Sequence, residues 1–277
     1  MKQTTLAKEV SLTGISLHEG HNVTLTLRPA VADAGYTVIR ADKANARIAV
    51  HPRNIVEKQR RTLLFENGVE AHTVEHVLAA LYGMGVDNAE LVLTAPEPPA
   101  GDGSALVFCD MIKQAGTRQL AADRTEFTPS APVDIKDGNA GARIGPGKGG
   151  LDVEYTLDYG VPFMPRTTVK FTVTPEVFER EIGPARTFCL EQEALMLKAA
   201  GFGKGANTQN TLVVGPKGPM ENTLRYPDEY ARHKLLDVIG DLAVTNLRLN
   251  AMVAAERSGH SQNQKLAKAV RAQFEAI

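Results

Sequence analysis

The first 70 residues alternate short apolar runs with turn-forming residues, which is typical of an antiparallel sheet. In residues 23–27, apolar and polar side chains alternate, as expected for a strand with one buried face. Further β-prone runs follow at 36–39, 48–50 and 62–65, and Gly, Pro, Asn and Asp separate them. The pattern therefore predicts several short strands in this part of the chain.

The period then changes to that of a helix. Residues 73–82 predict a helix. Thr73 is a suitable N-cap at its start, and two glycines close to its end favour termination there. A strand at 89–93, a proline-rich loop and a second helix at 104–115 complete this half of the chain.

Residues 117–130 are polar and contain proline, and they are the best candidate for a boundary between two units. Residues 138–150 are rich in glycine and predict a turn region. The remaining elements of the second half are predicted as strands at 133–135, 151–158, 169–173, 211–214 and 251–256, and as helices at 190–200, 227–245 and from 263 onward.

The two halves end alike. Residues 73–115 and 227–272 each run helix, strand, loop, helix, and the loops GDGS (101–104) and GHS (259–261) are similar. We therefore expect a structural duplication in which two α+β units share a helical interface. Such an interface would bring His76 of the first unit close to His233 and Asp237 of the second.

Charge and composition exclude several classes of protein. The 277 residues carry a net charge of −1, which gives no electrostatic case for binding nucleic acid or an anionic membrane. No apolar run approaches the roughly 20 residues of a membrane span, and the N-terminus lacks a secretory pattern. The expected location is the cytoplasm. Cys109 and Cys189 are too few for a disulfide framework and are expected to be reduced.

One helix carries the main candidate chemistry. His233, Asp237 and Asp241 lie four residues apart, so they share one stripe of the predicted helix at 227–245. An imidazole and a carboxylate one turn apart can bind the same metal ion. The pattern alone favours a surface helix with a solvated polar face, because such faces are common.

Histidines elsewhere leave more than one interpretation open. Glu75 and His76 begin a helix and would complete a hydrolytic zinc centre with two His, one Asp and a Glu base. A pair formed by His72 and His76 is the alternative. His260, between Gly259 and Ser261, and His18, within residues 13–20, are either proton donors or ordinary loop residues. No GxSxG elbow or phosphate-binding P-loop is present in the sequence.

Seven motifs, taken together in order and spacing, resemble one family. The chain is similar over nearly its whole length to the UDP-3-O-acyl-N-acetylglucosamine deacetylases, zinc enzymes of the committed step of lipid A synthesis in Gram-negative bacteria. The motifs are TGISLHEG (13–20), TVEHVLAAL (73–81) with VDN (86–88), DGS (102–104), PARTF (184–188), LRYPDE (224–229), HKLLDVIGDL (233–242) and SGH (258–260).

The resemblance implies a role for each matching residue. His76, His233 and Asp237 would bind Zn²⁺, or Fe²⁺ in its place, and Glu75 would be the general base. His260 would be the general acid or an electrostatic partner, oriented by Asp241. The resemblance further implies that Thr187 and Lys234 contact the reacting amide or the sugar-nucleotide.

The resemblance also implies a fold and a substrate. The fold would be an α+β sandwich of two similar domains, 1–122 and 127–277, with helices between the sheets. An insertion at about 188–214 would bind the acyl chain of an acylated UDP-sugar, the expected partner of a monomeric enzyme. The implied substrate-binding residues are Phe188, Tyr159, His18, Leu195 and Phe202.

Some positions depart from the family pattern. Glu19 stands where the family has Ser, and DYGVP (158–162) replaces Asp-Phe-x-His-Pro; Gln262 and Gln264 also differ. The departures at Glu19 and near Tyr159 leave open a metal-dependent hydrolase of another N-acyl sugar. A third hypothesis is a binding protein without activity. The presence of Glu75 argues against it, because a binding protein has no need of a general base.

Overall fold

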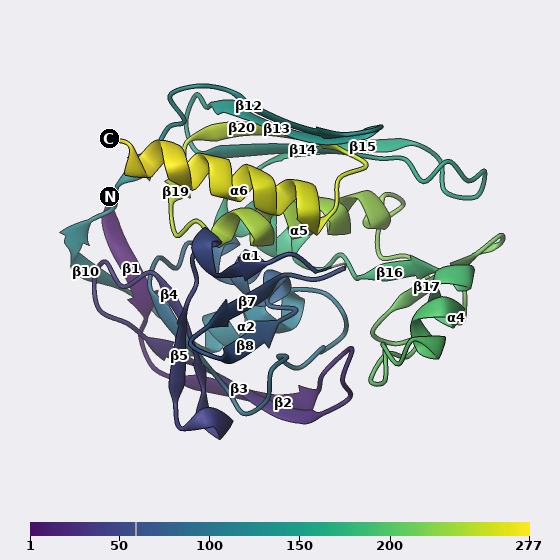
Figure 1. The fold of residues 1–277 in the computed structure, drawn as a ribbon, viewed down its shortest axis with the longest axis horizontal. Helices are drawn as coiled ribbons and strands as arrows, with labels where there is room; N and C mark the ends of the chain where they lie inside the picture. The colour runs from purple at the N-terminus through teal and green to yellow at the C-terminus, as the bar shows by residue number, and fades with distance from the viewer. Residues whose placement is uncertain (59) are drawn as a thin grey trace.

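Two five-stranded sheets form the outer layers of the molecule, and its long helices lie between them (Figure 1). The computed structural model describes residues 1–58 and 60–277. The predicted α+β sandwich of two similar units is therefore confirmed.

The first sheet has the strand order β2-β3-β9-β4-β5. Its neighbours pair antiparallel except β4 and β9, which are parallel. Burial alternates along β3, as the alternation of its sequence predicts. The strands are Val10–Ile15 (β2), Asn22–Pro29 (β3), Tyr36–Arg40 (β4), Ala46–Ala49 (β5) and Ala89–Leu93 (β9).

The second sheet repeats this arrangement as β12-β13-β20-β14-β15, again with one parallel pair, β14 and β20. In both sheets the fifth strand of the set lies in the middle, next to the second and third. This shared order is what a duplication predicts, while the domain bounds 1–122 and 127–277 stay a prediction. The strands are Val133–Asp137 (β12), Ala140–Pro146 (β13), Leu151–Leu157 (β14), Thr167–Thr172 (β15) and Ala251–Glu256 (β20).

Four long helices fill the space between the sheets, and the two units meet where α1 packs on α5. Three begin and end within two residues of their predicted bounds. The helices are Glu75–Gly83 (α1), Leu106–Ala115 (α2), Glu229–Ala243 (α5) and His260–Glu275 (α6).

The last helix begins earlier than predicted. His260 is the first residue of α6 and not a loop residue, which corrects the expectation of a helix from 263. Backbone N–H groups at the start of a helix have no partner within the helix. Here the N–H of Gly259, the residue before α6, donates to the side-chain oxygen of Gln262 at 3.0 Å, which caps the helix.

Each unit carries an insertion between its fourth sheet strand and its first long helix. The inner insertion, residues 55–72, is a small sheet packed against the body of the protein. The outer insertion, residues 188–219, is a second small sheet with a short helix, and it projects to the right in Figure 1. Their elements are Ile55–Val56 (β6), Leu63–Glu66 (β7), Val69–His72 (β8), Phe188–Leu190 (β16), Glu191–Ala199 (α4), Leu212–Gly215 (β17) and Gly218–Pro219 (β18).

Two predicted loop regions contain strands. Part of the polar segment 117–130 forms β10 (Thr117–Asp123), which pairs with β1 (Lys2–Leu6), and the glycine-rich segment 138–150 contains β13. Strand β13 is paired on both sides, so backbone hydrogen bonds hold it despite its small side chains. The remaining short elements are Ala41–Lys43 (η1), Pro52–Asn54 (η2), Glu126–Phe127 (β11), Pro175–Val177 (α3), Phe178–Ile182 (η3) and Arg248–Leu249 (β19).

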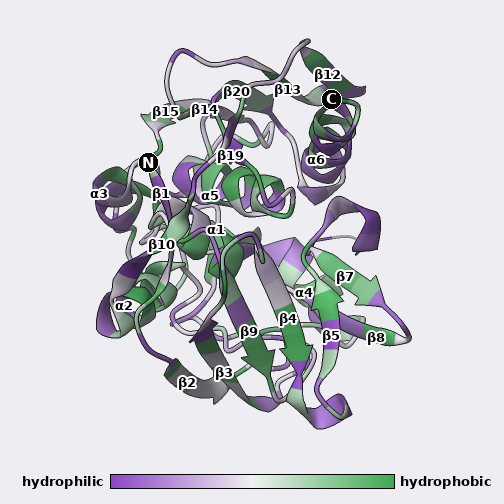
Figure 2. Cartoon of the chain, turned by 90° about the vertical axis from the view of Figure 1, so that its left-hand side faces the viewer, coloured by the Kyte–Doolittle hydropathy of each residue, from purple (hydrophilic) through white to green (hydrophobic). Residues whose placement is uncertain are grey.

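Helix α5 lies in the centre of the molecule. Its apolar residues, among them Leu235 and Ile239, are fully buried, and so are His233, Asp237 and Asp241 to within 3% exposure. The interpretation of this segment as a surface helix is therefore wrong. In Figure 2, green, hydrophobic segments lie around α1 and α5 in the centre of the molecule. Among the helices of the described residues, none is long and apolar enough to cross a membrane.

Candidate metal centre and active site

A sharp turn delivers Glu75 and His76 to the interface between the two units. Strand β8 ends at His72, and Thr73 has a positive φ of 56°, which is unusual for a β-branched residue. The Thr73 N–H donates to the Thr62 carbonyl oxygen at 2.9 Å and holds this conformation. Helix α1 then begins at Glu75, so that both side chains leave its first turn.

A glycine of α5 allows the two helices to meet at this point. A Cβ atom at Gly240 would lie 2.2 Å from the Glu75 carbonyl oxygen, far inside van der Waals contact. The missing side chain therefore lets α5 approach the backbone of α1, which places His233 and Asp237 opposite His76.

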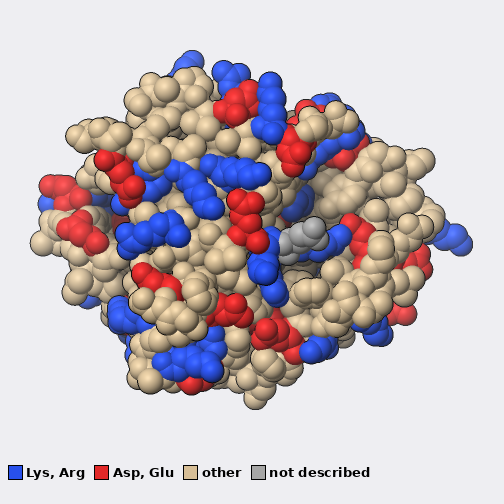
Figure 3. Space-filling model, in the orientation of Figure 1, with Lys and Arg blue, Asp and Glu red and all other residues tan. Residues whose placement is uncertain are grey.

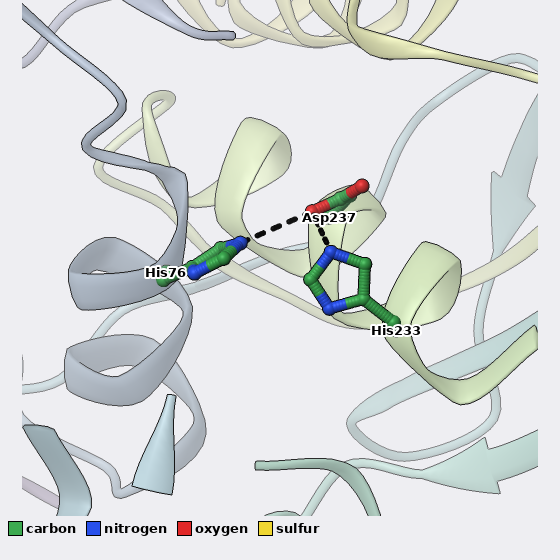
Figure 4. A group of neighbouring side chains, drawn as sticks. All are labelled: His76, His233 and Asp237. Carbon is green, nitrogen blue, oxygen red and sulfur yellow. Dashed lines mark ion pairs between the residues drawn. The ribbon is translucent and has the colours of Figure 1, made fainter. Parts of the chain in front are cut away.

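His76, His233 and Asp237 point toward a common centre (Figure 4). Asp237 Oδ1 lies 3.7 Å from His76 Nε2 and 3.5 Å from His233 Nε2. All three candidate ligand atoms lie within 4.8 Å of one another. Donor atoms of a tetrahedral metal with bonds of about 2.0–2.1 Å lie about 3.4 Å apart, so this spacing fits one ion.

The protonation states of the group also fit a metal. The His233 Nδ1–H donates to the Ala185 carbonyl oxygen at 3.1 Å, which leaves the Nε2 lone pair free on the side of Asp237. Burial lowers the pKa of His233 to about 3, so its imidazole is neutral. Burial alone would raise the pKa of Asp237, but Lys234 and His233 hold it well below its usual range.

Lys234 holds the second oxygen of the same carboxylate. Its Nζ donates to Asp237 Oδ2 at 2.6 Å. Burial opposes the charge of Lys234, but Asp237 raises the pKa of this amine above its usual value. The Oδ2 atom is thereby neutralised by Lys234, while Oδ1 faces the two histidines.

His72 does not belong to this group. Its Nε2 lies 3.2 Å from Glu19 Oε1 and its Nδ1 lies 3.1 Å from Thr73 Oγ1. Within residues 1–58 and 60–277, the geometry assembles His76, His233 and Asp237 as the one candidate metal group. The alternative pair of His72 and His76 is therefore not supported.

Glu75 and His260 face each other beside the three residues. Glu75 Oε1 lies 3.8 Å from His260 Nε2, and Glu75 Oε2 accepts the Thr62 N–H at 3.0 Å. Burial raises the pKa of Glu75, and the nearby His260 and His76 partly offset this effect. Its carboxylate therefore holds a proton more readily than an exposed one.

Asp241 lies behind the His260 ring, at the opposite side from Glu75. The His260 Nδ1–H donates to Asp241 Oδ2 at 2.9 Å, with Oδ1 at 3.1 Å. Burial opposes protonation of His260, but Asp241 and Glu75 outweigh it and raise the pKa of the ring to about 9. His260 is therefore a protonated donor at neutral pH.

The sequence interpretation missed two partners of Asp241. The Thr62 hydroxyl donates to Oδ1, and the Asn263 amide donates to Oδ2 at 2.9 Å. Asn263 lies three residues after His260 on α6, and that helical spacing is a signal that was available. Thr62 is 179 positions from Asp241, and no local pattern marks it.

A cavity of about 580 Å³ opens from the metal group toward the outer insertion. The surface in Figure 3 is hollowed beside the projecting lobe, and Lys and Arg side chains lie at the edge of this hollow. The cavity wall includes the predicted residues Glu75, His76, Thr187, Phe188, Tyr159, His18, Phe202, His233, Lys234, Asp237 and His260.

Aromatic rings form the wall next to the metal group. Phe188 lies between the rings of Tyr159 and Tyr230, with centroids at 5.6 and 4.9 Å, and its ring edge also meets His233. Farther out, the His18 ring packs edge-on against Phe202 at 5.9 Å. The outer insertion thus supplies apolar wall residues such as Leu197, Phe202 and Val213, together with the charged residues Glu193 and Lys198.

The structure corrects one predicted wall residue. Leu195 is 66% exposed and lies outside the cavity, whose wall on α4 is formed by Glu193, Ala194, Leu197 and Lys198. Only one face of this short helix turns inward, and Leu195 lies on the other.

The family comparison agrees with this geometry. The family model described as UDP-3-O-acyl N-acetylglycosamine deacetylase matches residues 3–272. Two relatives named UDP-3-O-acyl-N-acetylglucosamine deacetylase come from Anaeromyxobacter dehalogenans (strain 2CP-C) and Anaeromyxobacter sp. (strain Fw109-5). The first is 40% identical over 97% of this chain and 87% of its own length, and the second is 41% identical over 97% and 88%.

A more distant relative of the same name extends this result. The protein from Campylobacter jejuni subsp. jejuni serotype O:6 (strain 81116 / NCTC 11828) is 33% identical over 98% of this chain and 92% of its own length. Family match and relatives cover both units, including α1, α5 and the start of α6. The chain therefore belongs to the metal-dependent UDP-3-O-acyl N-acetylglycosamine deacetylase family.

Proposed function

We propose that this protein hydrolyses the N-acetyl group of UDP-3-O-(3-hydroxyacyl)-N-acetylglucosamine to the free amine and acetate, the committed step of lipid A synthesis. One observation carries the proposal. A candidate metal group, a buried carboxylate and a protonated imidazole converge at one end of a cavity that reaches the outer insertion, where Phe188, Leu197 and Phe202 add apolar surface.

His76, His233 and Asp237 would hold the metal, and we propose Zn²⁺ with Fe²⁺ as the alternative. Two imidazoles and one carboxylate suit either ion, and three protein ligands leave a position open. When bound, such an ion acidifies water and polarises the acetyl carbonyl. The neutral state of His233 and the charged state of Asp237 suit them to this role.

Glu75 takes the proton from the attacking water in this proposal. Its raised pKa gives it a greater proton affinity than an exposed Glu, and the Thr62 N–H fixes its Oε2. His260 then gives its Nε2 proton to the departing amine nitrogen, and Asp241 keeps the ring oriented. The C–N bond breaks, the amine keeps the proton, and the new oxygen stays on acetate.

The remaining cavity residues bind the substrate in this proposal. Thr187 and Lys234 lie at the metal end and would donate to the oxygen that becomes negatively charged during attack. Tyr159 and Phe188 would stack against the sugar-nucleotide. The acyl chain would extend toward the outer insertion along the apolar side chains of the wall, Phe202 and Leu197 among them.

We further propose that the protein works as a monomer of two domains, 1–122 and 127–277. The metal group draws His76 from the first and His233 with Asp237 from the second, so a single chain supplies every residue of the site. Gel filtration with light scattering tests this part of the proposal directly.

Acetate release tests the function. Protein stripped with a chelator is assayed on the acylated UDP-sugar without metal, with about one equivalent of Zn²⁺, and with Fe²⁺ under anaerobic conditions. Turnover restored by metal is expected. Tight metal binding without turnover contradicts this substrate and favours another N-acyl sugar, whereas absence of metal binding contradicts the assignment of the metal group.

A further inference from the structure

Thr62 contacts both the proposed base, Glu75, and Asp241, which orients the proposed acid His260. It belongs to the inner insertion, immediately before β7, and it is fully buried. Its N–H donates to Glu75 Oε2, while its hydroxyl donates to Asp241 Oδ1. In the part of the chain that the structure describes, no other residue is hydrogen-bonded to both Glu75 and the Asp241–His260 pair.

The direction of the hydroxyl proton follows from its partners. Gln264 Nε2 approaches Thr62 Oγ1 at 3.2 Å, and an amide NH₂ can only donate. Asp241 as a carboxylate can only accept, and the hydroxyl has one proton. Thr62 therefore accepts from Gln264 and donates to Asp241, so the three side chains form a directed chain of hydrogen bonds.

Among residues 1–58 and 60–277, the Gln264 side chain makes no hydrogen bond besides the one to Thr62. It is fully buried, and its Oε1 lacks a partner among the described residues. Burying an amide with an unpaired oxygen is costly. The contact from its NH₂ to Thr62 is thus its one polar interaction there, on the same helix as His260.

Both carboxylate oxygens of Asp241 accept hydrogen bonds from neighbouring side chains. Thr62 occupies Oδ1 and Asn263 occupies Oδ2, and the Asn263 amide is itself fixed by a hydrogen bond from the Ser258 hydroxyl at 3.0 Å. With both oxygens fixed, the carboxylate presents one orientation to His260 Nδ1. The charged groups that face this ring are Asp241, Glu75 and Asp237.

We propose that Thr62 is a positioning residue for the reaction. Its hydroxyl, aligned by Gln264, fixes the Asp241 carboxylate and thereby the direction of the His260 imidazole. This inference rests on the proposed function for its effect on turnover, whereas its effect on His260 can be observed without substrate.

Thr62→Val and Thr62→Ser separate the hydroxyl from the other features of the residue. Val keeps the shape, the burial and the backbone N–H to Glu75 but removes the hydroxyl, and Ser restores it. We expect kcat to fall on the order of tenfold or more in Thr62→Val and to stay within about twofold in Thr62→Ser. KM and bound metal should be unchanged in both.

The Nδ1–H proton of His260 reports the positioning independently of turnover. NMR of ¹⁵N-histidine-labelled protein should show this strongly hydrogen-bonded proton in the wild type and in Thr62→Ser. In Thr62→Val it should shift upfield or exchange faster. An unchanged resonance in Thr62→Val overturns the inference, whatever the activity. Absence of acetate release from the wild type, with the NMR difference present, contradicts the proposed function and supports the positioning role.

A double-mutant cycle tests whether Gln264 acts through Thr62. Gln264→Leu should lower kcat about two- to threefold, and the double variant should match Thr62→Val alone, because Gln264 has nothing left to align. Effects that multiply overturn this part of the inference. A loss of kcat in Thr62→Ser as large as in Thr62→Val would also overturn it, because the hydroxyl would then not be the group that matters.

Discussion

The inner and outer insertions occupy the same place in two units of equal strand order, yet they contact different parts of the candidate site. The inner insertion packs on the body and supplies Thr62, whose polar groups contact Glu75 and Asp241. The outer insertion projects from the body and supplies apolar side chains, Leu197 and Phe202 among them, to the cavity wall. In the proposed function, one insertion of the duplicated scaffold thus organises proton transfer and the other binds the substrate.

This contrast divides the expected effects of mutation. Changes around the inner insertion should lower kcat, because they disturb groups that act in the transition state. Changes in the outer insertion should raise KM for long acyl chains, because they remove binding that is equal in both states.

The largest effect is expected at Glu75, the residue that the Thr62 N–H holds. Glu75→Gln keeps the size and the hydrogen bond but cannot accept a proton, so kcat should fall about 10²- to 10⁴-fold. Metal content, measured by elemental analysis, should remain at the wild-type value. A variant that keeps full activity would contradict the role of Glu75 as base.

The pH profile should report the pairing of Asp241 and His260. Because the pKa of His260 is raised to about 9, the ring is protonated below that pH, and log(kcat/KM) should decline as pH rises through about 9. Asp241→Asn removes the charge that raises this pKa, so the alkaline decline should move to lower pH. At neutral pH, activity should fall by about 10²-fold. An alkaline limb that does not move in Asp241→Asn would contradict His260 as the proton donor.

Gly240 tests the contact that brings the two units together. In Gly240→Ala the new Cβ would lie 2.2 Å from the Glu75 carbonyl oxygen, so α1 and α5 must separate. We expect a loss of about 1–3 kcal/mol in the free energy of unfolding, despite a gain of up to about 1 kcal/mol in helix propensity. Metal affinity should fall as well.

Gly145→Ala is the matched control for this variant. Gly145 lies in β13 and nothing surrounds the position of an added Cβ within 4 Å. Its free energy of unfolding should change by less than about 0.5 kcal/mol. Equal stability of both variants in denaturant titrations would show that the close approach of the helices is not needed.

The same contrast marks what the sequence could predict. Helical spacing identified the stripe of His233, Asp237 and Asp241, and the resemblance assigned the first two to a metal site and Asp241 to the orientation of His260. Thr62 was beyond reach, because its partner is 179 positions away and a threonine before an apolar strand carries no local signal. Leu195 was misplaced because α4 is weakly amphipathic, so its sequence does not tell which face turns inward.

Strand β13 and helix α6 teach a related lesson. Glycines favour turns locally, but in β13 two neighbouring strands supply hydrogen bonds that override this preference. His260 was expected in a loop because Gly259 precedes it, whereas Gln262 caps the helix at that position. Local sequence thus predicts elements well where one face is buried, and poorly where distant partners decide.

The smallest effect, and the sharpest test of the contrast, is expected on α4. Leu197 lines the cavity and Leu195, two residues away on the same helix, is exposed. Leu197→Ala removes apolar contact worth about 1–2 kcal/mol, so KM for a long-chain substrate should rise about tenfold with kcat unchanged. For a substrate with a short acyl chain the effect should vanish, because that chain does not reach α4. Leu195→Ala should leave both constants at wild-type values. Equal behaviour of the two variants would contradict the proposal that the outer insertion binds the acyl chain, and with it the contrast between the two insertions.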